Sequence, residues 1–328
     1  MTGRGRFRDR IDAARARIAL GDLDGARRML DELRHDPGCR TEGLATVLGL
    51  PRQLQATLLS LAKREGDALA RIGYQYTLVP PTDDLVPILA PTAEERRWAA
   101  EADRIPVPRV LHQVWIGPRP VPATAAAWAD HARRRGYGYR LWRESDLAEF
   151  GLDADPIFAD RLVRNDIPGA VDVARYAILG RHGGIYLDCD WYPGRHDLSF
   201  HDRLPMLGLV ALAEDIPRAT GLGSLLLANS FIAAPPGHPV FARLLAALPR
   251  LRGRLPGAPA WWATGPLAFT LAARGGSVAV ADAGLVAAAA PTGAGRADLE
   301  AMAEANAGAD GGLLIAWKPW SDGPSAPD

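Results

Sequence analysis

Hydrophobic residues recur at every third or fourth position in the first part of the chain, which is the spacing of an amphipathic helix. The pattern is clear over residues 11–18 and again over 26–33, with Gly21 and the segment 36–38 as breaks. A second helical group is expected over residues 44–72. We therefore predict a helical region at the start of the chain, whose first two helices resemble one tetratricopeptide-like hairpin.

Two proline-rich segments follow this helical region. Residues 79–91 and 105–108 are both predicted to be extended connectors, because proline restricts the residue before it and cannot donate a backbone hydrogen bond. We therefore predict two domains, a helical N-terminal region over residues 1–104 and a second domain over residues 105–328.

After the second connector, short apolar runs alternate with a helical pattern. Val110–Ile116 is predicted as a strand, Ala123–Arg135 as a helix and Tyr139–Trp142 as a second strand. This order is typical of a parallel sheet in an α/β protein, where ligands bind beyond the carboxyl ends of the strands. Val114 and Trp115, which close the first strand, are therefore candidate binding residues.

Composition and charge exclude several classes of protein. The 328 residues are 48% hydrophobic, enough for a large core. Lys plus Arg and Asp plus Glu both total 38, so no overall charge would attract nucleic acid or an anionic membrane. No run approaches the roughly 18 apolar residues of a membrane span, and no apolar signal segment follows the basic start. With only Cys39 and Cys189 as cysteines, we expect a cytoplasmic protein without disulfides.

The most informative segment brings two carboxylates to the end of a strand. Gly183 and Gly184 stop a helix and turn the chain, and Ile185–Leu187 is predicted as a short buried strand that ends at Asp188 and Asp190. Two carboxylates separated by one residue suit a hard cation such as Mn²⁺ or Mg²⁺, which takes phosphate oxygens as further ligands.

Asp-x-Asp also occurs in other kinds of site, which differ in the residues that follow the second Asp. The tripeptide often only caps a turn. A calcium loop requires glycine and oxygen ligands after the second Asp, where this chain has Trp191, Tyr192 and Pro193. An aspartyl-phosphate phosphatase is expected to have Thr or Val at the position of Tyr192. A nucleotide-sugar site is therefore the better interpretation.

In its motifs the chain resembles a known family, the DXD-motif glycosyltransferases. This family includes yeast mannosyltransferases that initiate outer chains, capsular polysaccharide transferases and, more distantly, large glucosylating toxins. The resemblance covers roughly residues 105–320. The matching segments are His112–Gly117, Tyr139–Trp142, Asp172–Asp190, Asn229–Ala234, Gly237–Pro239 and Thr264–Pro266.

The resemblance implies both a fold and an activity. The fold would be α/β of the GT-A type, a Rossmann-like sheet flanked by helices, here with an N-terminal helical subdomain. The activity would be metal-dependent transfer of a hexose from a UDP- or GDP-linked sugar, with retention of configuration. The acceptor, whether glycan, peptide or small molecule, stays open.

The resemblance also implies roles for the residues before the two carboxylates. Trp115 would stack on the nucleobase with Val114 beside it, and Asp172 and Arg175 would hold sugar hydroxyls. The alternatives are that Trp115 is an ordinary core aromatic and that Asp172 and Arg175, three residues apart on one helix face, form a surface ion pair.

Four further residues would complete the donor site and the metal site. Tyr186 and Asn229 would line the donor pocket; the alternative for Asn229 is a hydrogen-bonding residue at a strand end. Asp190 would ligate the metal directly. Asp188 would contribute to the metal site or touch the ribose.

One departure from the family lies near the C-terminus. Relatives commonly end with a histidine-containing motif that closes in Ser-Trp, whereas residues 316–321 contain no histidine and no such ending. Lys318 is expected to pair with phosphate instead, and Trp320 to cover the donor. Because this motif is incomplete, an inactive transferase-like interaction protein remains an alternative, as does a metal-dependent phosphohydrolase.

Overall fold

The structure is a computed structural model that describes residues 3–38, 46, 48–78, 82–214, 226–255, 258–291, 293–309 and 312–317. The described chain divides into two compact units. The first unit ends at Asp84 and the second begins at Leu85. The functional division at residue 104 remains a prediction. Among the described residues, no helix combines the length and the hydrophobicity needed to cross a bilayer.

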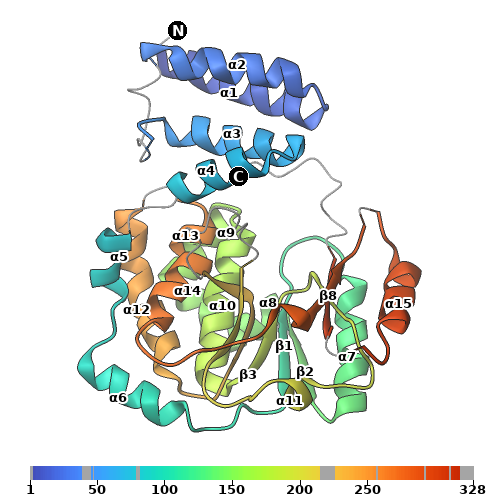
Figure 1. Ribbon diagram of the computed structural model, residues 1–328. Coiled ribbons are helices and arrows are strands. Elements are labelled where there is room, and N and C mark those ends of the chain that lie inside the picture. Colours follow the sequence, from blue (N-terminus) through green and yellow to red (C-terminus); the bar gives the residue numbers. More distant parts are fainter. Residues whose placement is uncertain are drawn as a thin grey trace. The chain divides into compact units, whose positions relative to one another are not determined.

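The first unit is helical, as the hydrophobic spacing predicted. It contains α1 (Gly3–Ala19), α2 (Leu23–His35), α3 (Arg52–Glu65) and α4 (Ala68–Leu78) (Figure 1). Ile11, Leu30 and Leu54 from the first three helices are fully buried and form one core. Part of the predicted helical group at 44–72 lies outside the described residues.

The prediction of an extended connector over residues 79–91 was wrong for its described part. Residues Thr82–Leu89 form a helix, α5, although it contains Pro87. Leu85 and Leu89 are buried on one face of this helix, and burial of these side chains outweighs the cost of the proline. A second helix, α6 (Ala93–Ala102), follows directly.

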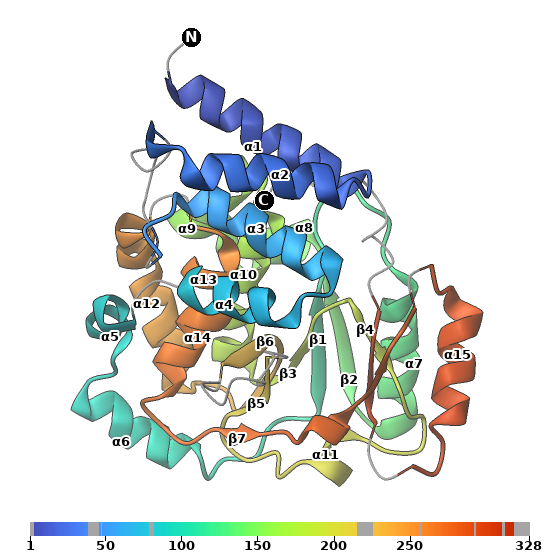
Figure 2. The ribbon, with the colours of Figure 1, turned by 45° about the horizontal axis from the view of Figure 1, so that its top comes forward.

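A six-stranded sheet forms the centre of the second unit (Figure 2). The strand order is β2 (Gly138–Trp142), β1 (Val110–Val114), β3 (Gly184–Leu187), β6 (Leu227–Ala234), β5 (Val210–Ala213), β7 (Ala279–Val280). As predicted, β1 runs parallel to β2, and it is also parallel to β3. The predicted sheet was parallel, but β6 is antiparallel to both its neighbours. The start of β6 therefore lies at the same edge as the carboxyl ends of β1 and β3.

Helices flank this sheet, and the predicted α/β fold is confirmed. The helices are α7 (Ala123–Arg135), α8 (Glu144–Glu149), α9 (Pro156–Val163), α10 (Ile167–His182), α11 (Phe200–Arg203), α12 (Pro239–Arg254), α13 (Ala260–Ala263), α14 (Pro266–Ala273) and α15 (Arg296–Ala305). Ile185, Val210 and Phe231 from three strands are fully buried in one core cluster.

A smaller sheet lies beside α7 and α15. Its strands are β4 (Trp191–Pro193), β9 (Leu314–Ala316) and β8 (Val286–Ala289), in that order. β4 pairs antiparallel with β9. Because β4 begins directly after Asp190, this sheet connects the carboxylate motif to the last described segment of the chain.

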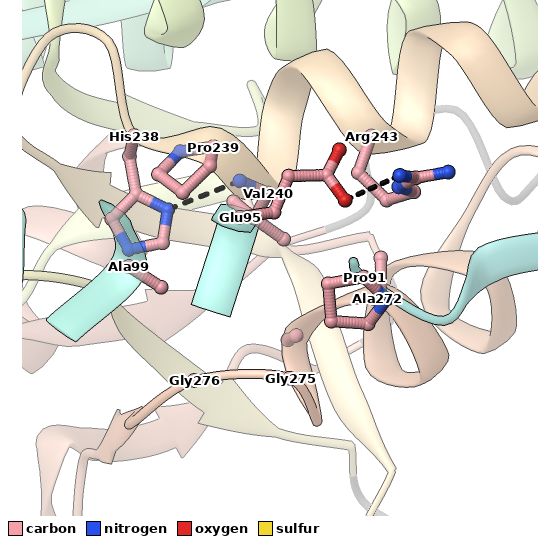
Figure 3. Close-up of a pocket in the computed structure, with 11 residues that line it drawn as sticks. Pro91, Glu95, Ala99, His238, Pro239, Val240, Arg243, Ala272, Gly275 and Gly276 are labelled. Atoms are coloured by element: carbon pink, nitrogen blue, oxygen red, sulfur yellow. Dashed lines mark hydrogen bonds and ion pairs between the residues drawn. The ribbon is translucent and has the colours of Figure 1, made fainter. Parts of the chain in front are cut away.

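A small cavity marks where α6 packs in the second unit. It measures about 20 Å³, enough for about one water molecule. Figure 3 shows that Glu95 of α6 points toward Arg243 of α12, with which it forms an ion pair. The Nδ1 atom of His238 accepts a hydrogen bond from the Val240 backbone N–H at 3.3 Å. The ion pair links α6 to α12, and the hydrogen bond from Val240 caps the start of α12.

Candidate active site

The turn before β3 requires two glycines. Gly183 and Gly184 have φ angles of +61° and +95°, which favour glycine. A Cβ atom on Gly184 would lie 2.7 Å from the Val110 carbonyl oxygen, and one on Gly183 would lie 2.5 Å from the Pro236 nitrogen. The Nε2 atom of His112 lies 3.1 Å from the Gly183 carbonyl oxygen. This turn directs β3 toward the carboxyl edge of the sheet.

The backbone of the carboxylate motif is held by other elements. Four consecutive carbonyl groups, from residue 188 to residue 191, each accept a hydrogen bond. The donors are Gln113 Nε2 to Asp188 (3.3 Å), Thr124 Oγ1 to Cys189 (2.6 Å), the Trp317 backbone N–H to Asp190 (2.7 Å) and Trp128 Nε1 to Trp191 (2.8 Å). We call these four donors the carbonyl clamp. They fix the direction in which the two carboxylates leave the backbone.

A buried arginine joins the two aspartates that the sequence placed on separate elements. Arg175 Nη2 lies 3.1 Å from Asp172 Oδ1 and 3.1 Å from Asp188 Oδ1. The side chains of Asp172 and Arg175 are only 6% and 5% exposed, so a surface ion pair is excluded. The guanidinium also lies 4.5 Å from the centre of the Tyr186 ring and donates to the Asn229 carbonyl.

Asp172 receives hydrogen bonds on both carboxylate oxygens. Thr264 Oγ1 donates to Oδ2 at 2.7 Å, and Asn229 Nδ2 donates to Oδ1 at 2.7 Å. The hydroxyl of Tyr176 lies 3.1 Å from Asn229 Nδ2 and donates to the Thr264 carbonyl at 2.8 Å. The structure thus brings α10, β6 and the junction of α13 with α14 together around one carboxylate.

The charges of this network follow from burial and from its partners. Burial raises the pKa of Asp172 to about 6, while Arg175 and the donated hydrogen bonds oppose the rise, so this carboxyl is ionised at neutral pH. Burial alone would lower the pKa of Arg175. Asp188, Tyr186 and Asp172 reverse that effect and hold the pKa above its ordinary value. Arg175 is therefore a fixed cation.

Asp188 and Asp190 have different surroundings. The Tyr186 hydroxyl donates to Asp188 Oδ1 at 2.7 Å, and the Asp188 side chain is 27% exposed. Asp190 is half-buried, and its carbonyl is held by Trp317. In the described part of the chain, no three His, Cys, Asp or Glu side chains gather as a metal site. Two carboxylates do fit a hard divalent cation whose remaining ligands are water or phosphate oxygens.

The structure places the remaining predicted residues as follows. Val114 is buried, and its carbonyl oxygen lies 3.6 Å from Cys189 Sγ. Trp115 is half-buried at the end of β1, and its Nε1 donates to the Arg119 carbonyl at 3.0 Å. Lys318 and Trp320 lie outside the described residues.

Sequence reasoning missed the residues that support the carboxylates from behind. Gln113 belongs to the His-Gln segment and Thr264 to the Thr-Gly-Pro segment, so the motifs contained a signal for both. Thr124 and Trp128 lie on α7 within no motif, and only the tertiary structure shows that they hold the turn.

The sheet and these side chains define an α/β protein with paired carboxylates and a fixed arginine at the carboxyl edge of its strands. Residues 126–204 match the sequence profile of a family described as "Glycosyltransferase sugar-binding region containing DXD motif". This segment includes Asp172, Arg175, Asp188 and Asp190. The resemblance to DXD-motif glycosyltransferases is therefore confirmed for the part of the chain that carries the motif.

Known proteins that are similar to the chain include the following two. One is "Uncharacterized glycosyltransferase L373" of Acanthamoeba polyphaga mimivirus, 29% identical over 140 residues, which are 41% of this chain and 53% of that protein. The chain thus spans about half the length of this curated relative. The other is a solved structure titled "PaToxG Glycosyltransferase", with a TM-score of 0.42, 19% identity and coverage of 55% of this chain and 73% of that chain.

Proposed function

We propose that this protein transfers a hexose from a UDP- or GDP-linked sugar to an acceptor, with retention of configuration. The observation that carries the proposal is the network that joins Asp172, Arg175 and Asp188 behind a motif whose backbone is held by the carbonyl clamp. Such a preorganised site can hold the cation that a departing diphosphate requires.

Asp172 and Arg175 each retain capacity for one more hydrogen bond. A carboxylate offers about four lone-pair sites, and three are used by Arg175, Thr264 and Asn229. A guanidinium offers about five N–H donors, and four are directed at Asp172, Asp188 and two backbone carbonyls. In our proposal the remaining site on each residue binds a hydroxyl of the donor sugar. The main effect of Asp172 and Arg175 is to hold Asp188 and Asn229 in position.

Asp188 and Asp190 would hold a divalent cation, Mn²⁺ or Mg²⁺. When bound, the cation would neutralise negative charge on the diphosphate of the donor. Tyr186 donates to Oδ1 of Asp188, and in our proposal the second oxygen of this carboxylate faces the cation. The carbonyl clamp holds both aspartates in place before the donor binds, so the motif need not become ordered on binding.

The nucleobase would contact the residue that follows β1, and the diphosphate would contact residues that follow β9 in the chain. Trp115, half-buried at the end of β1, is proposed to stack on the nucleobase beside Val114. Lys318 directly follows Trp317, whose backbone N–H donates to the Asp190 carbonyl. This proximity along the chain supports Lys318 as the cation that pairs with phosphate, and Trp320 as a cover over the donor.

Release of nucleotide from a panel of UDP- and GDP-sugars in the presence of Mn²⁺ tests the proposal. We expect slow release from at least one sugar, and loss of release in Asp190→Asn. The matched control is Asp153→Asn, which removes an exposed carboxylate of the same unit and should leave release unchanged. Stereochemistry is checked by NMR of the anomeric proton of the product.

Two results would contradict the proposal. Absence of binding of every nucleotide sugar would indicate an inactive interaction protein. Release of inorganic phosphate from small phosphomonoesters, lost in the same Asp190→Asn variant, would indicate a phosphohydrolase.

A further inference from the structure

A cleft of about 260 Å³ lies between α7 and α15 in the second unit. These two helices lie side by side in Figures 1 and 2. Asp130 and Arg134 line the wall formed by α7, and Glu300 and Glu304 line the wall formed by α15. Tyr192 of β4 also lines the cleft. None of these residues belongs to the carboxylate network or to the carbonyl clamp, so the site described above does not account for the cleft.

Tyr192 is the first sign that the cleft accommodates a ligand. The residue is only 3% exposed, and its ring packs in a cluster with Leu299, Ile315 and Trp317. The side chain nevertheless lines the cleft, and it makes no hydrogen bond to any residue that the structure describes. A tyrosine phenol carries its proton at neutral pH. Its hydroxyl can both donate to and accept from a molecule in the cleft.

The second sign is the mixture of donors and acceptors on the walls. Arg296 donates to Glu300 at 2.7 Å, which matches one acid with one base. Arg134 and Glu304 form no ion pair with any described residue, and they carry opposite charges. Burial and Arg134 lower the pKa of His196, another lining residue, so its imidazole is neutral and offers one donor and one acceptor.

This composition selects a class of ligand. A phosphate or other anion would face three carboxylates, and a cation would face two guanidinium groups. A metal ion would lack ligands, because the described residues contain no suitable group of three. An apolar molecule would remove water from charged side chains without replacing their hydrogen bonds. A neutral molecule with several hydroxyl groups satisfies donors and acceptors at once.

We propose that this cleft is a binding site for a neutral sugar residue, separate from the two carboxylates of the transfer site. α7 connects the two sites physically: Thr124 and Trp128 hold the motif backbone, while Asp130 and Arg134 line the cleft. The cleft needs neither a nucleotide nor a metal ion, and it would function in the absence of transfer.

Saturation-transfer difference NMR with neutral methyl glycosides tests this proposal. The probes are the methyl α-pyranosides of glucose, mannose and galactose and the methyl β-glycoside of N-acetylglucosamine, without nucleotide or metal. We expect transfer to at least one probe. In Tyr192→Phe its Kd should rise about tenfold, because one hydrogen bond is lost while the ring stays in the core. Glu304→Gln should weaken binding by a similar factor, and Asp190→Asn should not change it.

Several outcomes would overturn the proposal. One is the absence of saturation transfer to every glycoside in both wild type and Tyr192→Phe, when the two proteins melt at the same temperature. Another is equal affinity in both proteins. Loss of binding in Asp190→Asn with retention in Tyr192→Phe would place the sugar in the transfer site instead. Saturation transfer to glycine, with none to the glycosides, would identify the cleft as a site for zwitterions.

Discussion

Acid should destabilise the protein through His112, which lies at the base of the turn before β3. The residue is buried, its Nε2 atom lies 3.1 Å from the Gly183 carbonyl oxygen, and Trp142 Nε1 donates to Nδ1 at 3.1 Å. These partners assign the proton to Nε2. A second proton, on Nδ1, would face the indole N–H of Trp142, and the hydrogen bond between them would be lost. Burial, with a contribution from His182 and Arg140, lowers the pKa of His112 to about 4.

The size of the effect follows from the difference between folded and unfolded pKa values. The pKa falls from 6.5 in the unfolded chain to about 4 in the folded protein, so the unfolded chain takes up its proton first. The free energy of unfolding should therefore be unaffected well above the higher value and should decrease as pH falls between the two. The loss from this residue is about 2 kcal/mol near pH 5 and about 3 kcal/mol near pH 4.

Urea unfolding followed by tryptophan fluorescence measures this loss, in wild type and in His112→Gln. The glutamine side chain can still donate to the Gly183 carbonyl but does not titrate. His131, whose pKa burial also lowers to about 4, is present in both proteins, so the difference between them isolates His112. An equal dependence of stability on pH in the two proteins would refute the reasoning. A constant offset between them would show only altered packing.

Three further substitutions test the supports of the site. Gly184→Ala should lower the free energy of unfolding by about 1–3 kcal/mol, because the residue has a φ of +95° and the Val110 carbonyl would lie 2.7 Å from the new Cβ. Gly253→Ala is the control, since open space surrounds that position, and thermal melting should show no loss of stability. Thr124→Val should lower the free energy of unfolding by about 1–3 kcal/mol, because the Cys189 carbonyl loses its donor. Thr124→Ser keeps the hydroxyl and should retain most of the wild-type stability in urea titrations. Phe241→Ala empties a fully buried position and should cost about 3–5 kcal/mol by the same measurement.

The order of elements in the sheet domain was predictable because local patterns encode it. Val110–Val114, α7 and β2 each have a period or a composition of their own, and a helix that crosses over between two neighbouring strands makes them parallel. The reversal of β6 was not predictable, because an apolar strand has the same pattern in either direction. Pro87 misled the reading of α5, since the buried face of that helix matters more than one missing donor.

The site shows the same division between local and tertiary information. Asp188, Asp190, Asp172 and Arg175 lie within one short segment, so their spacing could be interpreted from the sequence. Their mutual distances could not. Arg175 reaches Asp188 only because α10 and β3 reverse tightly at the two glycines. The donors of the carbonyl clamp lie far from their acceptors in the sequence, as Trp317 and Asp190 illustrate, and no local pattern marks such contacts.

Because Cys189 is buried, its reactivity can report when the carboxylate motif opens. The thiol lies between the two aspartates in the chain, is 5% exposed, and has its pKa raised above the ordinary value by burial and by Asp188. An alkylating reagent attacks an accessible thiolate, so it can modify this cysteine only while the turn is open. In a Cys39→Ser background, the alkylation rate would therefore count the openings of the motif, and a ligand that closes the turn would register as protection of a sulfur atom that it never touches.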